Sequence, residues 1–389
     1  MSRLRRAVPC VAAVLVAASV AAGTASASKH MLVGINDEAN TLYGNPDVTF
    51  PILRRLHVQV LRVNLYWGGR FGVALERPQN ATNPRDPAYD WTLYDRTVNY
   101  ASQYGIKMLF SIYGTPGWAN RHQGLNRPPT RFRDLQRFAA AAARRYNGSF
   151  RAPDGRKLPR VRMWLAWNEP NNPIFLFPQY RRVKSHWVIQ SARTYARICN
   201  AVYDGIHGTL IKGERVGCGV TAPRGNDLPG SFRASVSPLV FLRACKKAGM
   251  RRFDVYAHHP YYGSKRETPA TKPRGHAVTL GNIGSLLRLI TKLYGPKHLW
   301  ITEYAYQTNP PDRGFGVSPA KQALYLREAF AIATRNPRID MMLWFLLRDE
   351  PNVPDGWQSG FYDVHGHRKP SYNAFRNAAR AATSHRKRR

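Results

Sequence analysis

Acidic residues are scarce in this sequence. Its 389 residues include 23 Asp and Glu against 59 Lys and Arg, which gives a formal net charge of +36. A field of that sign attracts anionic surfaces such as acidic polysaccharide, cell-envelope polymers or nucleic acid. The cations are scattered along the chain and no nucleic-acid-binding signature accompanies them, so we expect no nucleic-acid partner. Two interpretations of the charge stay open: a specific anionic target, and a generally basic surface.

Long apolar runs are also lacking, with one exception at residues 7–22. That run follows three arginines within the first six residues and precedes Ala25-Ser26-Ala27, a small-x-small cleavage pattern. We therefore expect a signal peptide over residues 1–27, cleavage before Ser28, and a secreted, extracellular protein of bacterial type. An uncleaved membrane anchor is the alternative. No second run is long enough to cross a bilayer, so no membrane span is expected after cleavage.

Cysteines and nucleotide-binding motifs are few or missing. Three of the four cysteines lie beyond the expected cleavage point, at Cys199, Cys218 and Cys245. An exported chain permits a disulfide, but an odd number leaves at least one thiol unpaired, and the pairing stays open. None of them has metal-ligand spacing, so we expect no metal. No G-x-G-x-x-G follows the first predicted strand and no P-loop is present, so we expect no cofactor.

Strand-like and helix-like segments alternate along the rest of the chain. The predicted strands are 31–36, 59–66, 106–113, 161–167, 216–221, 253–259, 298–303 and 339–346. The predicted helices are 51–57, 91–104, 132–146, 186–207, 238–248, 281–293, 319–334 and 371–382. Strands alternating with helices indicate an α/β fold with a parallel sheet, and eight such units predict a closed (β/α)8 barrel, or TIM barrel. We expect one domain over residues 28–382, roughly 360 residues with the tail, which suits this fold. The last residues, 383–389, are expected to form a basic C-terminal tail.

Two glutamates fall at the carboxyl ends of predicted strands, where a barrel builds its active site. Glu169 ends the fourth strand just before Pro170, and Glu303 ends the seventh. Side-chain alternation predicts that Glu169 shares a face with Trp167, and Glu303 with Ile301. Cleavage of a glycosidic bond requires two such carboxyl groups on one rim, one protonated and one ionised. The alternative for either glutamate is a helix cap or an ion pair with one of the many arginines.

These motifs resemble those of the large (β/α)8 clan of glycoside hydrolases whose catalytic glutamates follow strands four and seven. The likeness is closest to the cellulase-like and xylosidase-like members. Trp167-Asn168-Glu169-Pro170 is similar to the strand-four motif of the clan, and Ile301-Thr302-Glu303-Tyr304 to its nucleophile motif. The resemblance implies that Glu169 is the acid/base and Glu303 the nucleophile. It also implies that Asn168 hydrogen-bonds the 2-hydroxyl of the sugar.

Three further positions resemble supporting residues of the clan. Arg62, in the second strand, matches an arginine that lies beneath the nucleophile, where its charge would hold that carboxylate ionised. His259 and Tyr261 match a His-x-Tyr pattern in the sixth unit. The resemblance implies that Tyr261 donates a hydrogen bond to the nucleophile. His258 is one residue out of phase, so we expect it to point toward the helices.

Several tryptophans are candidates for contacts with a sugar. Trp118 lies in a segment similar to the Thr-Pro-x-Trp-Ala loop of the clan, and Trp344 falls where a strand-eight tryptophan would floor the sugar site. Trp67, Trp118 and Trp357 suit two interpretations, as core residues or as sugar platforms, because aromatic faces serve both.

The sequence thus predicts a retaining glycoside hydrolase that cleaves β-linked O-glycosidic bonds in a polysaccharide or oligosaccharide. Retention requires the two carboxyl groups to lie about 5 to 5.5 Å apart. The many cations allow an anionic, uronate-bearing substrate as a hypothesis. The alternatives are a non-catalytic carbohydrate-binding protein on the same scaffold and a polyanion-binding protein.

Overall fold

The computed structural model describes residues 31–353 and 356–387. Eight parallel strands close into a barrel in the order β1-β10-β9-β8-β7-β4-β3-β2. The barrel strands are β1 (Leu32–Asn36), β2 (Val60–Tyr66), β3 (Lys107–Tyr113), β4 (Met163–Ala166), β7 (Arg215–Thr221), β8 (Val255–His258), β9 (Leu299–Tyr304) and β10 (Ile339–Phe345). The prediction of a (β/α)8 barrel is therefore confirmed.

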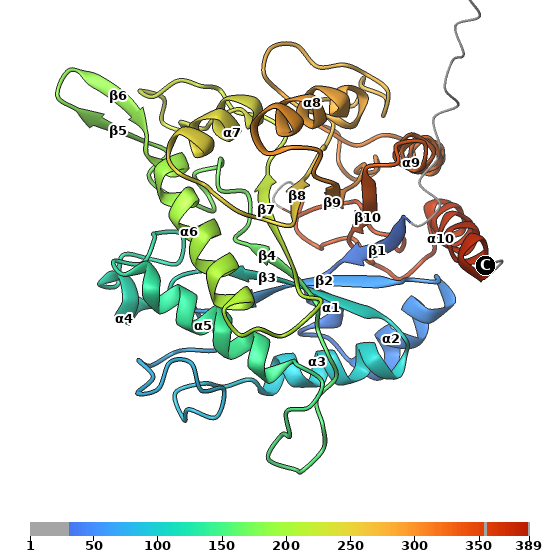
Figure 1. Ribbon diagram of the computed structural model, residues 1–389. Coiled ribbons are helices and arrows are strands. Elements are labelled where there is room, and N and C mark those ends of the chain that lie inside the picture. The colour runs from blue at the N-terminus through green and yellow to red at the C-terminus, as the bar shows by residue number, and fades with distance from the viewer. Residues whose placement is uncertain (1–30, 354–355, 388–389) are drawn as a thin grey trace, which may run out of the picture.

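Helices surround the barrel and connect successive strands (Figure 1). The longer ones are α2 (Pro46–Arg55), α3 (Thr92–Gln103), α5 (Phe132–Arg145), α6 (Gln190–His207), α7 (Pro238–Lys247), α8 (Ile283–Tyr294), α9 (Pro319–Thr334) and α10 (Ser371–Lys387). The short ones are α1 (Glu38–Thr41), α4 (Gly117–Asn120) and η1 (Leu280–Asn282). The expected signal peptide lies outside the described residues. Helix α10 continues to Lys387, so most of the segment expected to be a separate basic tail belongs to the last helix.

The core has two layers because each strand is buried on both faces. One set of side chains fills the inside of the barrel: Val60, Leu109, Leu165, Val220, Val255, Ala257, Trp300, Met341 and Leu343. The alternate residues of the same strands pack outward against the helices. This double burial explains why the strands are almost continuously apolar in sequence.

Close helix packing and a disulfide fix the side of the barrel beside β4 and β7. Helices α5 and α6 meet at Gly205, where an added Cβ would lie 2.3 Å from the carbonyl oxygen of Gln136. A disulfide joins Cys199 of α6 to Cys218 of β7, and Cys245 is a buried free thiol. The structure thereby decides the pairing that the sequence left open.

Two elements differ from the sequence prediction. The helix expected from residue 186 begins at Gln190, because the preceding residues form an antiparallel hairpin of β5 (Tyr180–Val183) and β6 (His186–Ile189). This hairpin projects from the body of the molecule at the upper left of Figure 1. Helix α2 begins at Pro46 rather than at residue 51; Asn45 caps it and Pro46 occupies its first turn, where a missing N–H costs nothing.

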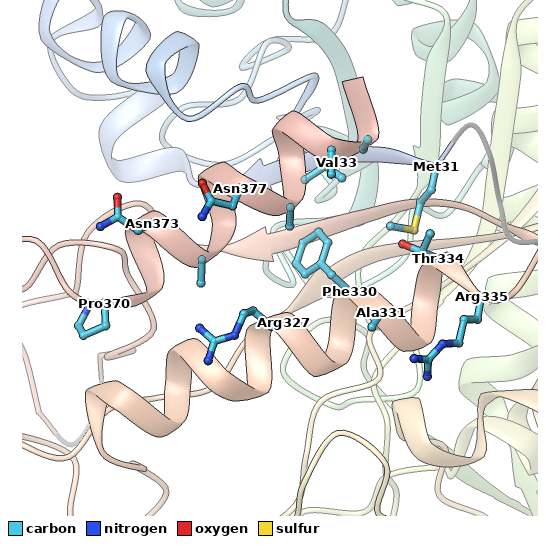
Figure 2. A pocket seen from close by; sticks show the side chains of 14 residues that line it. Met31, Val33, Arg327, Phe330, Ala331, Thr334, Arg335, Pro370, Asn373 and Asn377 are labelled. Atoms are coloured by element: carbon cyan, nitrogen blue, oxygen red, sulfur yellow. The ribbon is translucent and has the colours of Figure 1, made fainter. Parts of the chain in front are cut away.

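The outer layer contains an apolar groove of about 530 Å³ between α9 and α10. Figure 2 shows Phe330 of α9 between the two helices, with Val33 of β1 and the preceding residue Met31 nearby. The groove lies outside the ring of strands and is lined by no acidic residue. Within the described residues, no helix has the length and apolar character required to span a membrane.

Candidate active site

A cleft of about 370 Å³ opens where the carboxyl ends of the strands meet. It is lined by Asn36, Glu38, Ala39, Asn64, Asn168, Glu169, Asn172, Ile174, Phe175, Tyr261, Glu303, Phe345, Leu346, Glu350 and Trp357. These residues lie at the carboxyl ends of barrel strands one, two, four, six, seven and eight in chain order, or in the loops that follow them. In a (β/α)8 barrel this is the face that carries the active site.

Glu169 reaches the cleft because the backbone turns sharply after β4. The strand ends at Ala166, and Trp167 and Glu169 adopt left-handed conformations with φ of 73° and 33°. The prediction that Trp167 and Glu169 share a face is therefore wrong. The Trp167 ring is buried in the outer core, 5.0 Å from the ring of Tyr113. Such backbone costs about 1–3 kcal/mol per residue, so the surroundings must hold it in place.

The buried side chain of Asn171 holds this turn. Its Nδ2 donates to the carbonyl of Val236 at 2.8 Å, and its Oδ1 accepts from the backbone N–H of Ala222 at 2.8 Å. The N–H of Glu169 donates in turn to the carbonyl of Val220 at 2.9 Å. The backbone that carries the acidic side chain is thus tied to the end of β7 and to the loop that follows it.

Glu303 reaches the cleft through an irregularity in β9. Met342 of β10 pairs with Ile301 and Trp344 pairs with Tyr304, so β9 contains one residue more than its neighbour over this stretch. An extra residue reverses the alternation of side chains. Ile301 is consequently buried in the outer core while Glu303 lines the cleft, and the prediction that they share a face is wrong.

Three donors converge on the Glu303 carboxylate. Its Oε1 accepts from Nδ2 of Asn36 at 3.1 Å and forms an ion pair with Arg62, and its Oε2 accepts from the hydroxyl of Tyr261 at 3.0 Å. Burial alone would raise the pKa of Glu303. The charges of His259 and Arg62, with the hydrogen bonds from Arg62 and Tyr261, outweigh burial and hold this pKa below its ordinary value. Glu303 is therefore ionised at neutral pH.

Arg62 connects the two strand ends that carry the glutamates. Its side chain is 1% exposed and lies beneath the cleft. Besides the ion pair with Glu303, its Nη2 donates to Oδ1 of Asn168 at 2.7 Å. The guanidinium thus orients the Asn168 amide as well as the carboxylate, as bidentate donors of fixed geometry can.

His259 lies between the two glutamates. Its Nδ1 is 2.9 Å from Oε1 of Glu169 and 3.5 Å from Oε2 of Glu303, and its Nε2 is 3.0 Å from the Thr302 hydroxyl. The adjacent His258 is buried on the other side of the strand, where its ring contacts the Val278 carbonyl and burial lowers its pKa to about 3. His258 therefore lies away from the cleft.

The two glutamates are close but have different surroundings. One oxygen of each lies within 4.8 Å of the other and of a His259 ring nitrogen. Glu303 is paired with a cation, whereas the Glu169 side chain contacts His259 and accepts from Nδ2 of Asn172 at 3.2 Å. These three groups are also the described residues whose spacing suits a metal ion. The Glu303 carboxylate is already neutralised by the positive charge of Arg62, so it needs a metal ion less.

Neither Trp344 nor Trp118 lines the cleft. Trp344 alternates outward on β10, is fully buried, and donates from its indole N–H to the Ser359 carbonyl at 2.8 Å. The next residue, Phe345, lines the cleft instead. The prediction that Trp344 floors the sugar site is therefore wrong by one position along the strand. Trp118 packs edge-on against Trp67 with ring centroids 5.6 Å apart, and its indole donates to the Ala74 carbonyl.

Sequence reasoning missed most of the other lining residues of the cleft, among them Asn36, Glu38, Glu350 and Phe345. Asn36 ends the first strand and Glu38 follows two residues later, so the rule that singled out the other two glutamates would have found Glu38. Glu350 lies in an irregular segment after β10, and no local signal marked it. Trp357, left open as core or platform, lines the cleft.

The sequence matches no protein-family model and no curated protein sequence. Solved structures with the same fold include glycoside hydrolases. They include a family 39 glycoside hydrolase from the gut symbiont Bacteroides cellulosilyticus (TM-score 0.61, 18% identity) and a glucosidase from Croceicoccus marinus (TM-score 0.64, 14% identity). A family 1 β-glucosidase from Thermotoga maritima is also similar (TM-score 0.57, 14% identity).

The matches cover nearly all of this chain. The match to the family 39 enzyme covers 90% of this chain and 64% of that enzyme. The corresponding shares are 91% and 68% for the Croceicoccus marinus glucosidase, and 91% and 98% for the Thermotoga maritima β-glucosidase. The chain therefore spans about two thirds of the length of the first two. At identities this low the structural likeness shows a common fold only. The chemistry of this chain has to be argued from its own cleft.

Proposed function

We propose that this protein is a secreted retaining glycoside hydrolase that cleaves β-linked O-glycosidic bonds by double displacement. The observation that carries the proposal is the pair formed by Glu169 and Glu303, whose nearest oxygens lie within 4.8 Å. Retaining enzymes place their carboxyl groups about 5–5.5 Å apart, whereas inverting enzymes need about 6.5–9.5 Å to admit a water molecule. The likeness to glycoside hydrolases of the same fold supports the proposal.

In the first step Glu303 attacks the anomeric carbon and forms a glycosyl ester. The attack requires an ionised carboxylate, which the Arg62 ion pair and the lowered pKa provide. The bond from the anomeric carbon to the leaving oxygen breaks as Glu169 transfers its proton to that oxygen. Glu169 suits this role because its carboxyl group contacts no lysine or arginine among the described residues.

In the second step Glu169, now ionised, removes a proton from water. The resulting hydroxide attacks the anomeric carbon and releases Glu303, so the configuration of the sugar is retained. Asn168 is held by Arg62 with its amide at the cleft, where it can donate to the 2-hydroxyl of the sugar. His259 contacts both carboxyl groups and so keeps them in register through both steps.

Export from the cell is part of the proposal. The Cys199–Cys218 disulfide supports it, because such bonds persist in oxidising compartments. The apolar run after three arginines at the N-terminus supports it independently.

The experiment that tests the function is hydrolysis of a panel of β-linked polysaccharides and aryl glycosides with product configuration followed by NMR. We expect retention, and a 2-deoxy-2-fluoro glycoside should label Glu303. Glu303→Gln should abolish turnover without unfolding the protein, because it removes a charge but little volume. Inversion would refute the double displacement. Binding without hydrolysis of any substrate would favour a carbohydrate-binding protein instead.

A further inference from the structure

Acidic side chains gather in the cleft of a protein that has few of them. Glu38 and Glu350 line it together with Glu169 and Glu303, whereas no lysine or arginine is among its lining residues in the described part of the chain. The nearby Arg62 is buried and already engaged with Glu303 and Asn168. The mechanism uses two of the four carboxyl groups, so Glu38 and Glu350 need another explanation.

Glu38 is held firmly with its oxygens toward the cleft. Its Oε1 accepts from the backbone N–H of Asn64 at 2.7 Å, and its Oε2 accepts from the Tyr66 hydroxyl at 3.0 Å. A carboxylate oxygen accepts two hydrogen bonds, so each oxygen retains one acceptor position. The side-chain Oδ1 of Asn64, which also lines the cleft, is buried and has no hydrogen-bond partner among the described residues.

Glu350 lines the cleft from the neighbouring loop, which follows β10. Its Oε2 accepts from the backbone N–H of Trp357 at 2.7 Å, and its Oε1 accepts no hydrogen bond within residues 31–353 and 356–387. Asp37 ties this loop to that of Glu38, because its carboxylate accepts from the backbone N–H of Leu347 at 2.7 Å. The two unused carboxylates are thus fixed relative to one another and to the catalytic pair.

We propose that Glu38 and Glu350 select a neutral sugar by accepting hydrogen bonds from its hydroxyl groups, and that they exclude uronic acids from the catalytic subsite. Hydroxyl groups donate readily to carboxylates, and such charge-assisted bonds are strong. A substrate carboxylate could only accept, and it would meet acidic side chains with no lysine or arginine among the described lining residues to compensate them. The inference rests on the proposed function, since it names the class of sugar that the same site takes.

The net charge of the protein and the lining of the cleft therefore favour ligands of opposite charge. An excess of 36 positive charges can attract anionic polymers, but the lining of the cleft opposes an anionic sugar at the bond that is cleaved. The fold itself does not decide the matter. A β-glucuronidase from Bacteroides uniformis shares it, with a TM-score of 0.54 and 12% identity.

The test compares pairs of substrates that differ only at C6. Aryl β-glucoside is measured against aryl β-glucuronide, aryl β-galactoside against aryl β-galacturonide, and soluble β-glucan against its C6-oxidised form. We expect kcat/KM to favour the neutral member by about 100-fold or more, the factor that like charges several ångströms apart produce at a partly buried site. Equal or faster cleavage of the acidic member would overturn the inference and leave the proposed function standing.

Variants test whether these two residues cause the preference. Glu350→Gln and Glu38→Gln keep the acceptor oxygen but lose the charge, so each should narrow the neutral-to-acidic ratio by about tenfold. Glu76→Gln removes the same charge from an exposed position outside the cleft and should leave the ratio unchanged. An unchanged ratio in both cleft variants would refute the assignment. Glu350 is partly exposed, so Glu350→Gln keeps the test open should Glu38→Gln fail to fold.

Equilibrium binding separates this inference from the proposed function. If no substrate is cleaved, the proposed function fails, and binding of neutral and C6-oxidised β-glucan oligosaccharides then decides the inference. The titration is done at about 0.3 M salt, where exposed charges are screened. Tighter binding of the neutral oligosaccharide, with that preference lost in Glu350→Gln, would support the inference. Tighter binding of the oxidised form would overturn the inference.

Discussion

Replacing Arg62 with methionine should shift the acid limb of the activity profile to higher pH. The substitution keeps most of the volume of the side chain and removes its charge. Burial of Glu303 would then be opposed by fewer groups, so its pKa should rise. A hydrogen bond to a charged group is worth about 1.5–3 kcal/mol, which corresponds to about 1–2 pH units.

The assay is kcat/KM against pH, which reports the ionisation of the free enzyme. The wild-type acid limb should lie below pH 4.5, the ordinary value for a glutamate, because the pKa of Glu303 is lowered in the folded protein. The free energy of unfolding should also fall as the pH is lowered. The contribution of the ionised Glu303 is complete above the unfolded pKa and is lost as the pH falls through the lowered pKa of the folded state.

Arg145→Met is the matched control. Arg145 forms an ion pair with Asp95 between α5 and α3, with side chains that are 7% and 16% exposed, against 1% and 11% for Arg62 and Glu303. Each substitution strands a carboxylate and should cost about 3–5 kcal/mol of stability. Only the change at Arg62 should move the acid limb. If both variants fold and both keep the wild-type limb, the role of Arg62 is refuted. Arg62→Gln, which also removes the charge, serves if Arg62→Met does not fold.

Four other outcomes are expected. Glu169→Ala should lower kcat by about 10²–10⁴-fold, and azide, which needs no general base, should restore part of the rate on an activated substrate; no rescue would count against the acid/base assignment. Replacing Cys199 and Cys218 with serine should lower the free energy of unfolding by about 3 kcal/mol in urea titration, and an equal midpoint would show that the bond is dispensable. Lys369→Met should cost about 3–5 kcal/mol in the same measurement, because it leaves a buried aspartate without its cation. Mass spectrometry of the exported protein should find Ser28 at its N-terminus, and an intact residue 1 would indicate an anchor.

Local sequence patterns were sufficient to predict the architecture and the position of Glu169 and Glu303 at the ends of strands four and seven. A barrel strand buried on both faces is a short apolar run, and a helix between strands has an apolar face, so both can be read without a partner segment. Glu169 and Glu303 stood out because each breaks such a run at its carboxyl end. Arg62 stood out because a cation within a buried strand requires an anion to pair with.

Tertiary structure decided which way those side chains point and what meets them. The left-handed backbone at Trp167 and the extra residue in β9 are set by pairing with neighbouring strands, and each reverses an alternation that the sequence alone would continue. The position of Glu38 and Glu350 in one cleft depends on closure of the barrel, which brings the first and last strands side by side. A sequence specifies its own periodicity, but distances between residues some 300 positions apart exist only once the ring of strands has closed.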